Sequence, residues 1–524
     1  MQKRRFVALL ALFGALACLP APYGCQAECD GLVGKEKPGI DPPSGRFFFP
    51  TGLALTPDGR YLFVTNGNSD LKYNGGSLVV VDLLRYGERL EAFRANPQDV
   101  LASSCRYAPQ DPGVVECHEG SVEVTDGTAI GTTIPGLILE DKTIRTGYYP
   151  GFIALEELTT SGYSYWPTET ADGVRRYRLY MPVRGDLSVT FVDVITDDAS
   201  NVTCLDCGAG CDGDQPRDCE DGYRIEGPSE GREDHVTVTM PAEPYGLAVE
   251  PSGGFLVLAH LVGGSLSLVD LAGYQGELRR GGPDVVDVLE DVLGVDGEGR
   301  SGGYNVVQRD AADPCSWFYV SNRAAAQIAS LRVAGCDVAP SLDGVGQPED
   351  RGLRLVLGPS VVMTAPFGPL ESGADMRGMV MSADGNRLYA LSRTPPSLVV
   401  VDTTLEAGFP RNKVLDVVEV CPRPSVLRTR QGPLGRTLAY AVCYGSGEIY
   451  VVDTEDAQVV DRIVAGGGPH DLVIMPAEAP VQLQNLAFIT NFAEHSVGVI
   501  DLDETSETYH QMIGRIGWPE ELQQ

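Results

Sequence analysis

The sequence predicts an all-β fold, a single β-propeller of seven four-stranded blades, from three observations. A segment with a common pattern recurs seven times between residues 46 and 517. Each copy divides into short runs rich in Val, Leu, Ile and aromatic residues, bounded by Pro-Asp-Gly or Gly-Gly turn signals. The chain of 524 residues also exceeds the usual size of one hydrophobic core, which favours an architecture built from repeated modules.

The repeat is clearest in the copy that begins at Pro50, PTGLALTPDGRYLFVTN and then GGSLVVVDL, and in the copy at Pro244, PYGLAVEPSGGFLVLAH and then GGSLSLVDL. A fourth run precedes the next copy, as in KTIRTGYYP, HVTVTMPAEP, KVLDVVEVCPRP and QVVDRIVAGGGP. Because one blade cannot bury both of its faces, the blades are expected to pack on one another around a ring. The other copies begin at Met376 and Pro469 and, more weakly, near Pro150, Tyr304 and Pro424.

The pattern P-x-G-[LI]-A-[LV]-x-P-D-G-x-x-[LY]-[FY]-V-T-N, followed by S-[LV]-x-V-[VI]-D, resembles the YVTN-type β-propeller repeat. Residues 64–66 (VTN) and 489–491 (ITN) carry the signature most closely. The resemblance covers residues 46–517 and implies the fold. It implies little about function, because such propellers host binding proteins, scaffolds and a few enzymes.

The N-terminus is typical of an exported protein. Basic residues at positions 3–5 precede the apolar run 6–17 and Cys18, which together indicate a signal peptide. Residues 15–18 (ALAC) resemble the lipobox of bacterial lipoproteins, which implies a lipid on Cys18; an ordinary signal peptide cut nearby is the alternative. Leu19, where inner-membrane lipoproteins carry Asp, implies by the same resemblance an outer-membrane lipoprotein of the bacterial envelope, facing the periplasm or the exterior.

Two segments depart from the repeat and are expected as inserted loops on one rim of the ring, about residues 84–141 in the first copy and 196–234 in the second. Such insertions are where a repeat protein often acquires its partner. The predicted organisation is a signal peptide at 1–17, a lipid-anchored tether at 18–45, the propeller at 46–517 and a C-terminal tail at 518–524.

The net charge of −32 means that the surface as a whole repels phosphate backbones, so nucleic acid is not an expected partner. The acidity suits the solubility of an exported protein; adsorption of cations or of a basic partner is the functional alternative. No segment after the N-terminus has the long apolar run of a transmembrane helix.

Without Cys18, twelve of the thirteen cysteines remain, an even number that predicts disulfides in an oxidising compartment. The predicted strand order places two of the close pairs each on one face of the ring, which supports both the topology and the bridges. The disulfide candidates are Cys25 with Cys29, Cys105 with Cys117, Cys315 with Cys336, Cys421 with Cys443, and the group Cys204, Cys207, Cys211 and Cys219.

The group in CLDCGAGCDGDQPRDC is expected to form two disulfides that staple a Gly- and Asp-rich loop, with zinc or a redox pair as the alternatives. The acidic residues of this loop, and those of residues 290–298, are oxygen donors of the kind that calcium binds, but their spacing does not match a calcium loop. We therefore predict no metal and no cofactor. The acidic residues are Asp212, Asp214, Asp218, Glu220, Asp221, Glu290, Asp291, Asp296 and Glu298.

Six copies end their third run in Asp, and a residue repeated around a ring indicates a structural task, the capping of a turn at the strand end. These strand-end aspartates are Asp82, Asp193, Asp270, Asp402, Asp453 and Asp501.

The loops that enter each first strand and leave each second strand share one face near the central channel. Several Arg and His residues there predict a positive well for a small anion or a carboxylate-bearing peptide; turn capping and Arg–Asp pairing are the structural alternative. The entering positions are Thr51, Gly151, Tyr245, Arg377, Ser425 and His470, and the leaving positions are Asn66, Arg184, His260, Asn322, Arg323, Arg393, Tyr444 and Asn491.

The sequence therefore predicts a binding or scaffold propeller, anchored through its lipid, whose mouth or inserted loops contact a protein or a small anionic ligand. The alternative is a lactonase-like hydrolase acting at the mouth, with His260 or His470 as general base or metal ligand. That list of mouth residues holds no carboxylate, and the chain has no H-E-x-x-H or Walker pattern, so binding is the first expectation. The ligand-binding candidates are Tyr245, His260, Asn322, Arg323, Arg377, Arg393, Tyr444, His470 and Asn491.

Overall fold

The structure is a computed structural model of the chain, in which residues 38–524 form one compact unit. Cys18, Cys25 and Cys29 lie outside the described residues, as does the predicted signal peptide. None of the helices in the described part of the chain is both long and apolar enough to cross a membrane. The described residues are 39–124, 132–158, 169–170, 173–197, 199–208, 210–211, 216–227, 238–271, 283–294, 301–338, 351–365, 368–369, 375–432 and 435–518.

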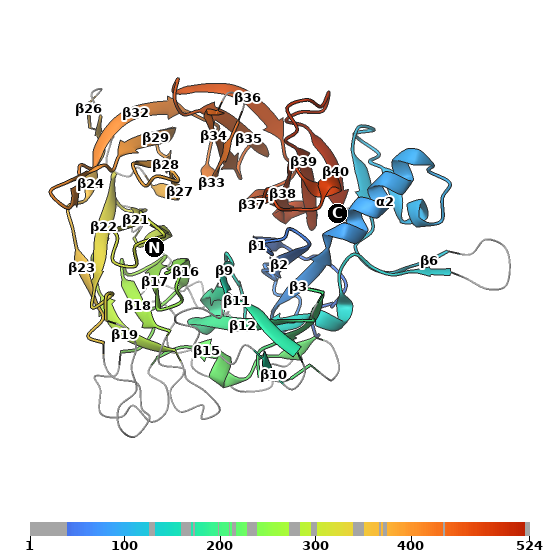
Figure 1. The fold of residues 1–524 in the computed structure, drawn as a ribbon, viewed down its shortest axis with the longest axis horizontal. Coiled ribbons are helices and arrows are strands. Elements are labelled where there is room, and N and C mark those ends of the chain that lie inside the picture. Colours follow the sequence, from blue (N-terminus) through green and yellow to red (C-terminus); the bar gives the residue numbers. More distant parts are fainter. Residues whose placement is uncertain are drawn as a thin grey trace, which may run out of the picture. The chain divides into compact units, whose positions relative to one another are not determined.

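The predicted seven-bladed β-propeller is confirmed, since the described residues build seven antiparallel blades arranged around a ring (Figure 1). Each blade adds its strands in chain order from the centre outwards, so the first strands lie innermost. The first four blades are β1 (Pro50–Leu55), β2 (Tyr61–Asn66), β3 (Gly76–Asp82) and β8 (Ile144–Thr146); β9 (Ala154–Glu157), β11 (Gly173–Val183), β12 (Ser188–Thr196) and β13 (Val202–Asp206); β16 (Pro244–Val249), β17 (Phe255–His260), β18 (Leu266–Asp270) and β19 (Asp284–Leu289); and β20 (Gly303–Gln308), β21 (Phe318–Asn322), β22 (Gln327–Ala334) and β23 (Arg354–Leu357).

The last three blades follow the same order, and blade 7 supplies its own fourth strand. They are β27 (Met376–Met381), β28 (Arg387–Arg393), β29 (Pro396–Asp402) and β32 (Lys413–Glu419); β33 (Pro424–Gln431), β34 (Thr437–Cys443), β35 (Glu448–Asp453) and β36 (Gln458–Val464); and β37 (Pro469–Ile474), β38 (Leu486–Asn491), β39 (Ser496–Asp501) and β40 (Met512–Ile516). Short additional strands are β10 (Glu169–Thr170), β15 (Arg224–Ile225), β24 (Val361–Val362), β25 (Thr364–Ala365), β26 (Gly368–Pro369), β30 (Leu405–Glu406) and β31 (Phe409–Pro410).

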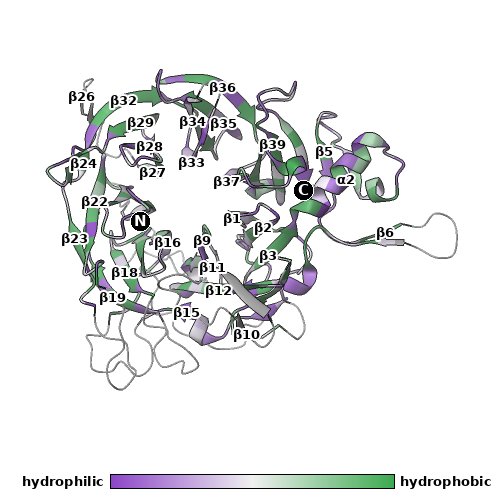
Figure 2. Cartoon of the chain, in the orientation of Figure 1, coloured by the Kyte–Doolittle hydropathy of each residue, from purple (hydrophilic) through white to green (hydrophobic). Residues whose placement is uncertain are grey.

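The middle strands of each blade are apolar on both faces because neighbouring blades cover both. Every residue of β2, β3 and β38 is buried, whereas β36 at an outer edge exposes most of its residues. Figure 2 shows the strands coloured mainly towards the hydrophobic end of the scale. The apolar runs of the sequence therefore form the layers between blades.

The innermost strands of neighbouring blades approach one another closely at the third residue of the first strand, as four of the blades show. A Cβ on Gly52 would lie 2.3 Å from the carbonyl oxygen of Gly151 in the next blade, and one on Gly246 would lie 2.4 Å from that of Tyr304. Blades 4 and 7 carry side chains at this position that bind the following blade instead. The Met379 N–H donates to Asn305 Oδ1 (3.0 Å) and the Leu53 N–H to Asp471 Oδ2 (2.9 Å), the latter joining blade 7 to blade 1.

The first inserted segment begins with helix α2 (Leu83–Ala95), capped by Asp82, whose side chain accepts from the Arg85 N–H. It continues through β4 (Cys105–Tyr107), β5 (Val115–Cys117), β6 (Val122–Val124) and β7 (Thr132–Ile134). Strand β5 pairs in parallel with β40 of blade 7, and Tyr86 of α2 belongs to the same buried cluster as Ile513. The segment therefore extends the outer edge of the last blade (Figure 1).

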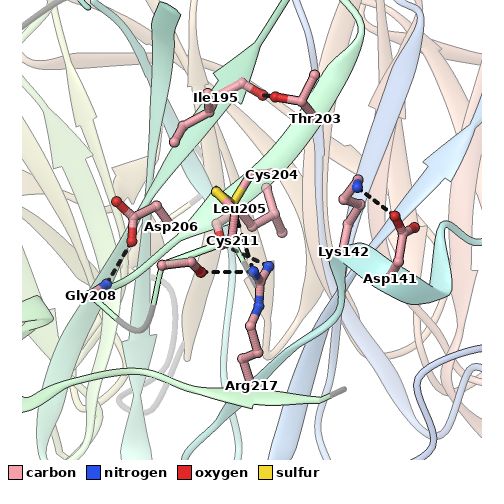
Figure 3. The surroundings of a disulfide bond; sticks show 11 residues. Asp141, Lys142, Ile195, Thr203, Cys204, Leu205, Asp206, Gly208, Cys211 and Arg217 are labelled. Atoms are coloured by element: carbon pink, nitrogen blue, oxygen red, sulfur yellow. Dashed lines mark hydrogen bonds and ion pairs between the residues drawn. A yellow bond between two sulfur atoms is a disulfide. The ribbon is translucent and has the colours of Figure 1, made fainter. Parts of the chain in front are cut away.

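The second inserted segment does the same to blade 1, because β14 (Arg217–Asp218) pairs in parallel with β8. Within this segment Arg217 donates to the carbonyls of Gly210 (2.7 Å) and Leu205 (3.1 Å) beside the Cys204–Cys211 bridge (Figure 3). The fourth-strand position of blade 2 is occupied by β13 and β15, both paired with β12. Residues 238–240, part of the predicted fourth run, are not in a strand.

Five disulfides are present in the described residues, which confirms the prediction for ten of the cysteines. The bridge between β4 and β5 staples the first inserted segment, and two bridges staple the second. The pairs are Cys105–Cys117, Cys204–Cys211, Cys207–Cys219, Cys315–Cys336 and Cys421–Cys443.

Candidate functional site

A cavity of about 630 Å³ lies where the first strands of all seven blades begin. Its lining includes the second residue of every first strand or, in blade 2, of the equivalent segment. We call this set the first-strand ring: Thr51, Gly151, Tyr245, Tyr304, Arg377, Ser425 and His470. Six of these blades have a register shift at the start of the first strand, which re-aims side chains as β-bulges do beside functional sites.

A second set of lining residues comes from the ends of the second strands. In blade 1 the first strand begins at Pro50, which pairs with Asn66 at the end of the second strand, and the next residue, Gly67, lines the cavity. The equivalent residue lines the cavity in every blade. We call this set the second-strand ring: Gly67, Arg184, Leu261, Arg323, Arg393, Tyr444 and Phe492.

The residue just before each first strand adopts the left-handed backbone conformation in all seven blades. That conformation is costly for residues with a Cβ, yet five of the blades place a side chain there. Tyr149, Glu243 and Arg423 of this set line the cavity. The φ values are 50° for Phe49, 56° for Tyr149, 52° for Glu243, 81° for Gly302, 48° for Asp375, 57° for Arg423 and 64° for Gly468.

Three arginines of blades 4 and 5 share one carboxylate, and we call them the arginine cluster: Arg323, Arg377 and Arg393 with Asp375. Arg377 contacts both oxygens of Asp375, through Nε at 2.7 Å and Nη2 at 2.8 Å. Arg323 and Arg393 stand at 3.9 and 4.0 Å from the same carboxylate. All three line the cavity, so one buried carboxylate faces three guanidinium groups.

The environment of Arg323 and Arg393 disfavours their charged forms. Burial, followed by repulsion from Arg377, lowers the pKa of each guanidinium from its ordinary value. Both remain cations at neutral pH, and Arg323 Nε is buried without a hydrogen bond. An anion in the cavity would relieve this repulsion.

The remaining charges at the cavity come from two further arginines and one carboxylate. Arg184 pairs with Glu243 at 2.7 Å, and both side chains are about one-third exposed. Arg423 is exposed and makes no ion pair among the described residues. The cavity is therefore positive on a chain whose net charge is −32.

Aromatic side chains form much of the rest of the lining. Tyr444, His470 and Phe492, which we call the aromatic wall, have ring centroids 6.0 to 6.4 Å apart, with His470 and Phe492 stacked. Tyr245 and Tyr304 lie 4.8 Å apart in blades 3 and 4, and the Arg377 guanidinium stands 4.6 Å from the Tyr304 ring centroid.

His470 is held in one neutral form. Burial lowers its pKa to about 4, and its Nδ1 lies 2.8 Å from the carbonyl oxygen of Thr51. Since a carbonyl only accepts, Nδ1 carries the proton and Nε2 is left as an acceptor.

Six of the nine predicted ligand-binding residues line this cavity: Tyr245, Arg323, Arg377, Arg393, Tyr444 and His470. The other three lie inside blades, one position earlier than the second-strand ring. His260 contacts Ala242 O and Ser267 Oγ (3.1 and 2.8 Å), and Asn322 accepts from the N–H groups of Ala324 and Ala325. Asn491 is fully buried beside Gly466 and Gly498.

Sequence reasoning missed Tyr304, Leu261, Phe492, Tyr149, Glu243 and Arg423, and with them the only lining carboxylate among the described residues. The first three each lie one position after a residue that joins the first strand of a blade to the second. In blade 4, for example, Gly303 lies opposite Asn322, and the next residues, Tyr304 and Arg323, line the cavity. Aligning the first strand with the second in each blade would therefore have identified these three residues. The other three stand before a strand, where no apolar pattern marks them.

The acidic residues singled out in the sequence do not gather into a metal site within the described residues. Asp218 pairs with Arg145, while Asp212, Asp214, Asp296 and Glu298 lie outside the described residues. One group has metal-ligand spacing in the described part of the chain, Cys315, Cys336 and Asp337, but its two cysteines are joined in a disulfide.

No family model and no curated protein sequence matches the chain. Solved structures resemble it at low identity. A candidate 6-phosphogluconolactonase of Bacteroides uniformis is 10% identical with a TM-score of 0.40, covering 79% of this chain and 83% of that one. A periplasmic gluconolactonase of Pseudomonas aeruginosa is 14% identical (TM-score 0.43; 82% and 89%), and hydrazine synthase of Kuenenia stuttgartiensis is 13% identical (TM-score 0.41; 90% and 98%). These likenesses assign no activity to this chain.

Proposed function

We propose that the chain is an envelope-anchored binding protein whose propeller mouth holds a small organic anion. One observation carries the proposal: five arginines line a single cavity that contains one lining carboxylate, Glu243, with Asp375 behind it. Guanidinium groups bind carboxylates and phosphates through paired hydrogen bonds. The volume of about 630 Å³ lies within the usual range for small-molecule sites.

Two features support the proposed envelope location: the N-terminal sequence pattern and the disulfide bonds. Residues 3–18 have the order of a lipoprotein signal, and disulfides persist in oxidising compartments. We propose that a lipid on Cys18 tethers the propeller to the outer membrane. Both inserted segments pair with neighbouring blades, so we assign ligand binding to the mouth rather than to them.

A lactonase-like hydrolase is less well supported by this cavity. Hydrolysis needs a general base with a free, basic atom near the substrate. Glu243 is paired with Arg184, Asp375 is held by Arg377, and the pKa of His470 is lowered to about 4. Neither carboxylate is free and the imidazole of His470 is only weakly basic, so the cavity favours binding over hydrolysis.

The test is calorimetric titration of the mature protein at low salt with benzoate, phthalate, phenyl phosphate and glucuronate. We expect at least one to bind, and Arg393→Gln to weaken it about tenfold or more, because a charge-assisted hydrogen bond is lost while Asp375 keeps Arg377. Arg387→Gln is the matched control, because Arg387 and Arg393 are the two ends of β28 and Arg387 lies away from the cavity. Absence of binding by every probe, or equal loss in the control, would overturn the proposal.

A further inference from the structure

The arginine cluster carries more positive charge than the protein neutralises. Three guanidinium groups face the single carboxylate of Asp375, so two positive charges are left in blades 4 and 5. The one carboxylate of the lining among the described residues, Glu243, is already paired with Arg184. A ligand with one negative charge would leave the cluster with a net positive charge, whereas a dianion would balance it.

Backbone contacts hold the cluster in position to receive such a ligand. Arg323 Nη1 donates to the carbonyl of Leu261 at 2.9 Å, and Arg393 Nε donates to that of Pro424 at 3.1 Å. Arg377 is fixed by both oxygens of Asp375 and by the Tyr304 ring beneath it. Because these side chains are already ordered, little conformational entropy is lost when an anion binds.

The aromatic wall faces the same cavity from blades 6 and 7. Tyr444 is 37% exposed, although its ring contacts those of His470 and Phe492. Exposed rings on a cavity wall offer a surface on which another ring gains contact area and stacking energy. His470 adds a hydrogen-bond acceptor at Nε2, because its Nδ1 proton is used by Thr51.

We infer that the ligand of the mouth cavity is a cyclic dianion, with two negative charges at the arginine cluster and a ring against the aromatic wall. This inference rests on the proposed function and names the class of ligand. A phosphate monoester of a cyclic alcohol and a cyclic dicarboxylate share this chemistry.

Four probes separate charge from ring: phenyl phosphate, its monoanionic methyl ester, ethyl phosphate and phthalate. At pH 7.5 we expect phenyl phosphate or phthalate to bind about tenfold more tightly than the methyl ester, because one charge-assisted contact is lost. Phenyl phosphate should bind about threefold or more tightly than ethyl phosphate, because the ring contact is lost. The tighter of the two dianions identifies the phosphate or the dicarboxylate class.

Variants at Tyr444 assign the ring contact. Tyr444→Ala should remove the preference for phenyl over ethyl phosphate and leave ethyl phosphate binding unchanged, and Tyr444→Phe should keep the preference. Because Tyr444 is partly exposed, both variants are expected to fold. Equal binding of mono- and dianions, or a ring preference that survives Tyr444→Ala, would overturn the inference while the proposed function stands. Binding by none of the four, together with none in the earlier panel, would remove the proposed function itself.

Discussion

The strand-end aspartates and the first-strand ring occupy repeated positions in the blades, but they use repetition in opposite ways. The aspartates are one residue type placed six times, and the ring is a set of six residue types placed at seven equivalent positions. Asp402 accepts from the Thr404 N–H (3.0 Å), and Asp501 accepts from the Asp503 N–H (2.8 Å). A position that carries the same residue type in most blades therefore serves the fold. A position whose residue type differs from blade to blade can contribute to a binding site.

Three of the strand-end aspartates cap the following turn, as the sequence predicts: Asp402, Asp453 and Asp501. Asp82 caps helix α2 instead. The other two hold buried arginines. Asp193 lies within β12 and pairs with Arg178 at 2.6 Å, and Asp270 pairs with Arg351 at 2.7 Å. The capping prediction therefore holds for the exposed turns, while the buried pairs have an additional role in the core.

The largest expected effect is at one of these buried pairs. Asp270→Ala should lower the free energy of unfolding by about 3–5 kcal/mol, because it leaves the charge of Arg351 buried without its partner. Urea denaturation checks this, with Ser425→Ala of the first-strand ring as the control, expected to change stability little. If the two variants lose similar stability, the contrast between fold positions and site positions fails.

A smaller effect is expected from His260, which is fully buried and whose pKa burial lowers to about 4. Between pH 4 and the ordinary value of 6.5, the unfolded chain binds a proton that the folded chain does not. Stability should therefore fall as the pH drops from 6.5 to 4, by about 3 kcal/mol from this residue. His260→Gln should flatten that slope in urea denaturation, and an unchanged slope would contradict the account.

Most of the fold followed from the sequence because each blade repeats both its apolar runs and its turns. The disulfides also followed, since Cys315 with Cys336 and Cys421 with Cys443 flank predicted strands. The lining of the mouth was harder to predict, because successive residues of a strand point to opposite faces. An error of one residue in the predicted end of a second strand therefore selects the buried Asn491 in place of Phe492, which lines the cavity. The sequence predicts an inserted loop after Asp82, whereas the structure has helix α2 there.

The positions of Glu243, Asp375 and Arg423 at the mouth could not be predicted from the sequence pattern. Each adopts a left-handed conformation before a first strand, and only the backbone path brings the three to one face of the ring. The shared carboxylate of Asp375, which decides the charge balance of the site, is therefore visible only in the structure.

The most direct test of the central claim is a crystal structure of the protein with p-bromophenyl phosphate, in which anomalous scattering from bromine locates the ring. We expect phosphate oxygens within hydrogen-bonding distance of Arg323, Arg377 or Arg393, and the bromine beside Tyr444. A cavity that stays empty at saturating ligand, or a ligand bound elsewhere on the ring, would contradict it.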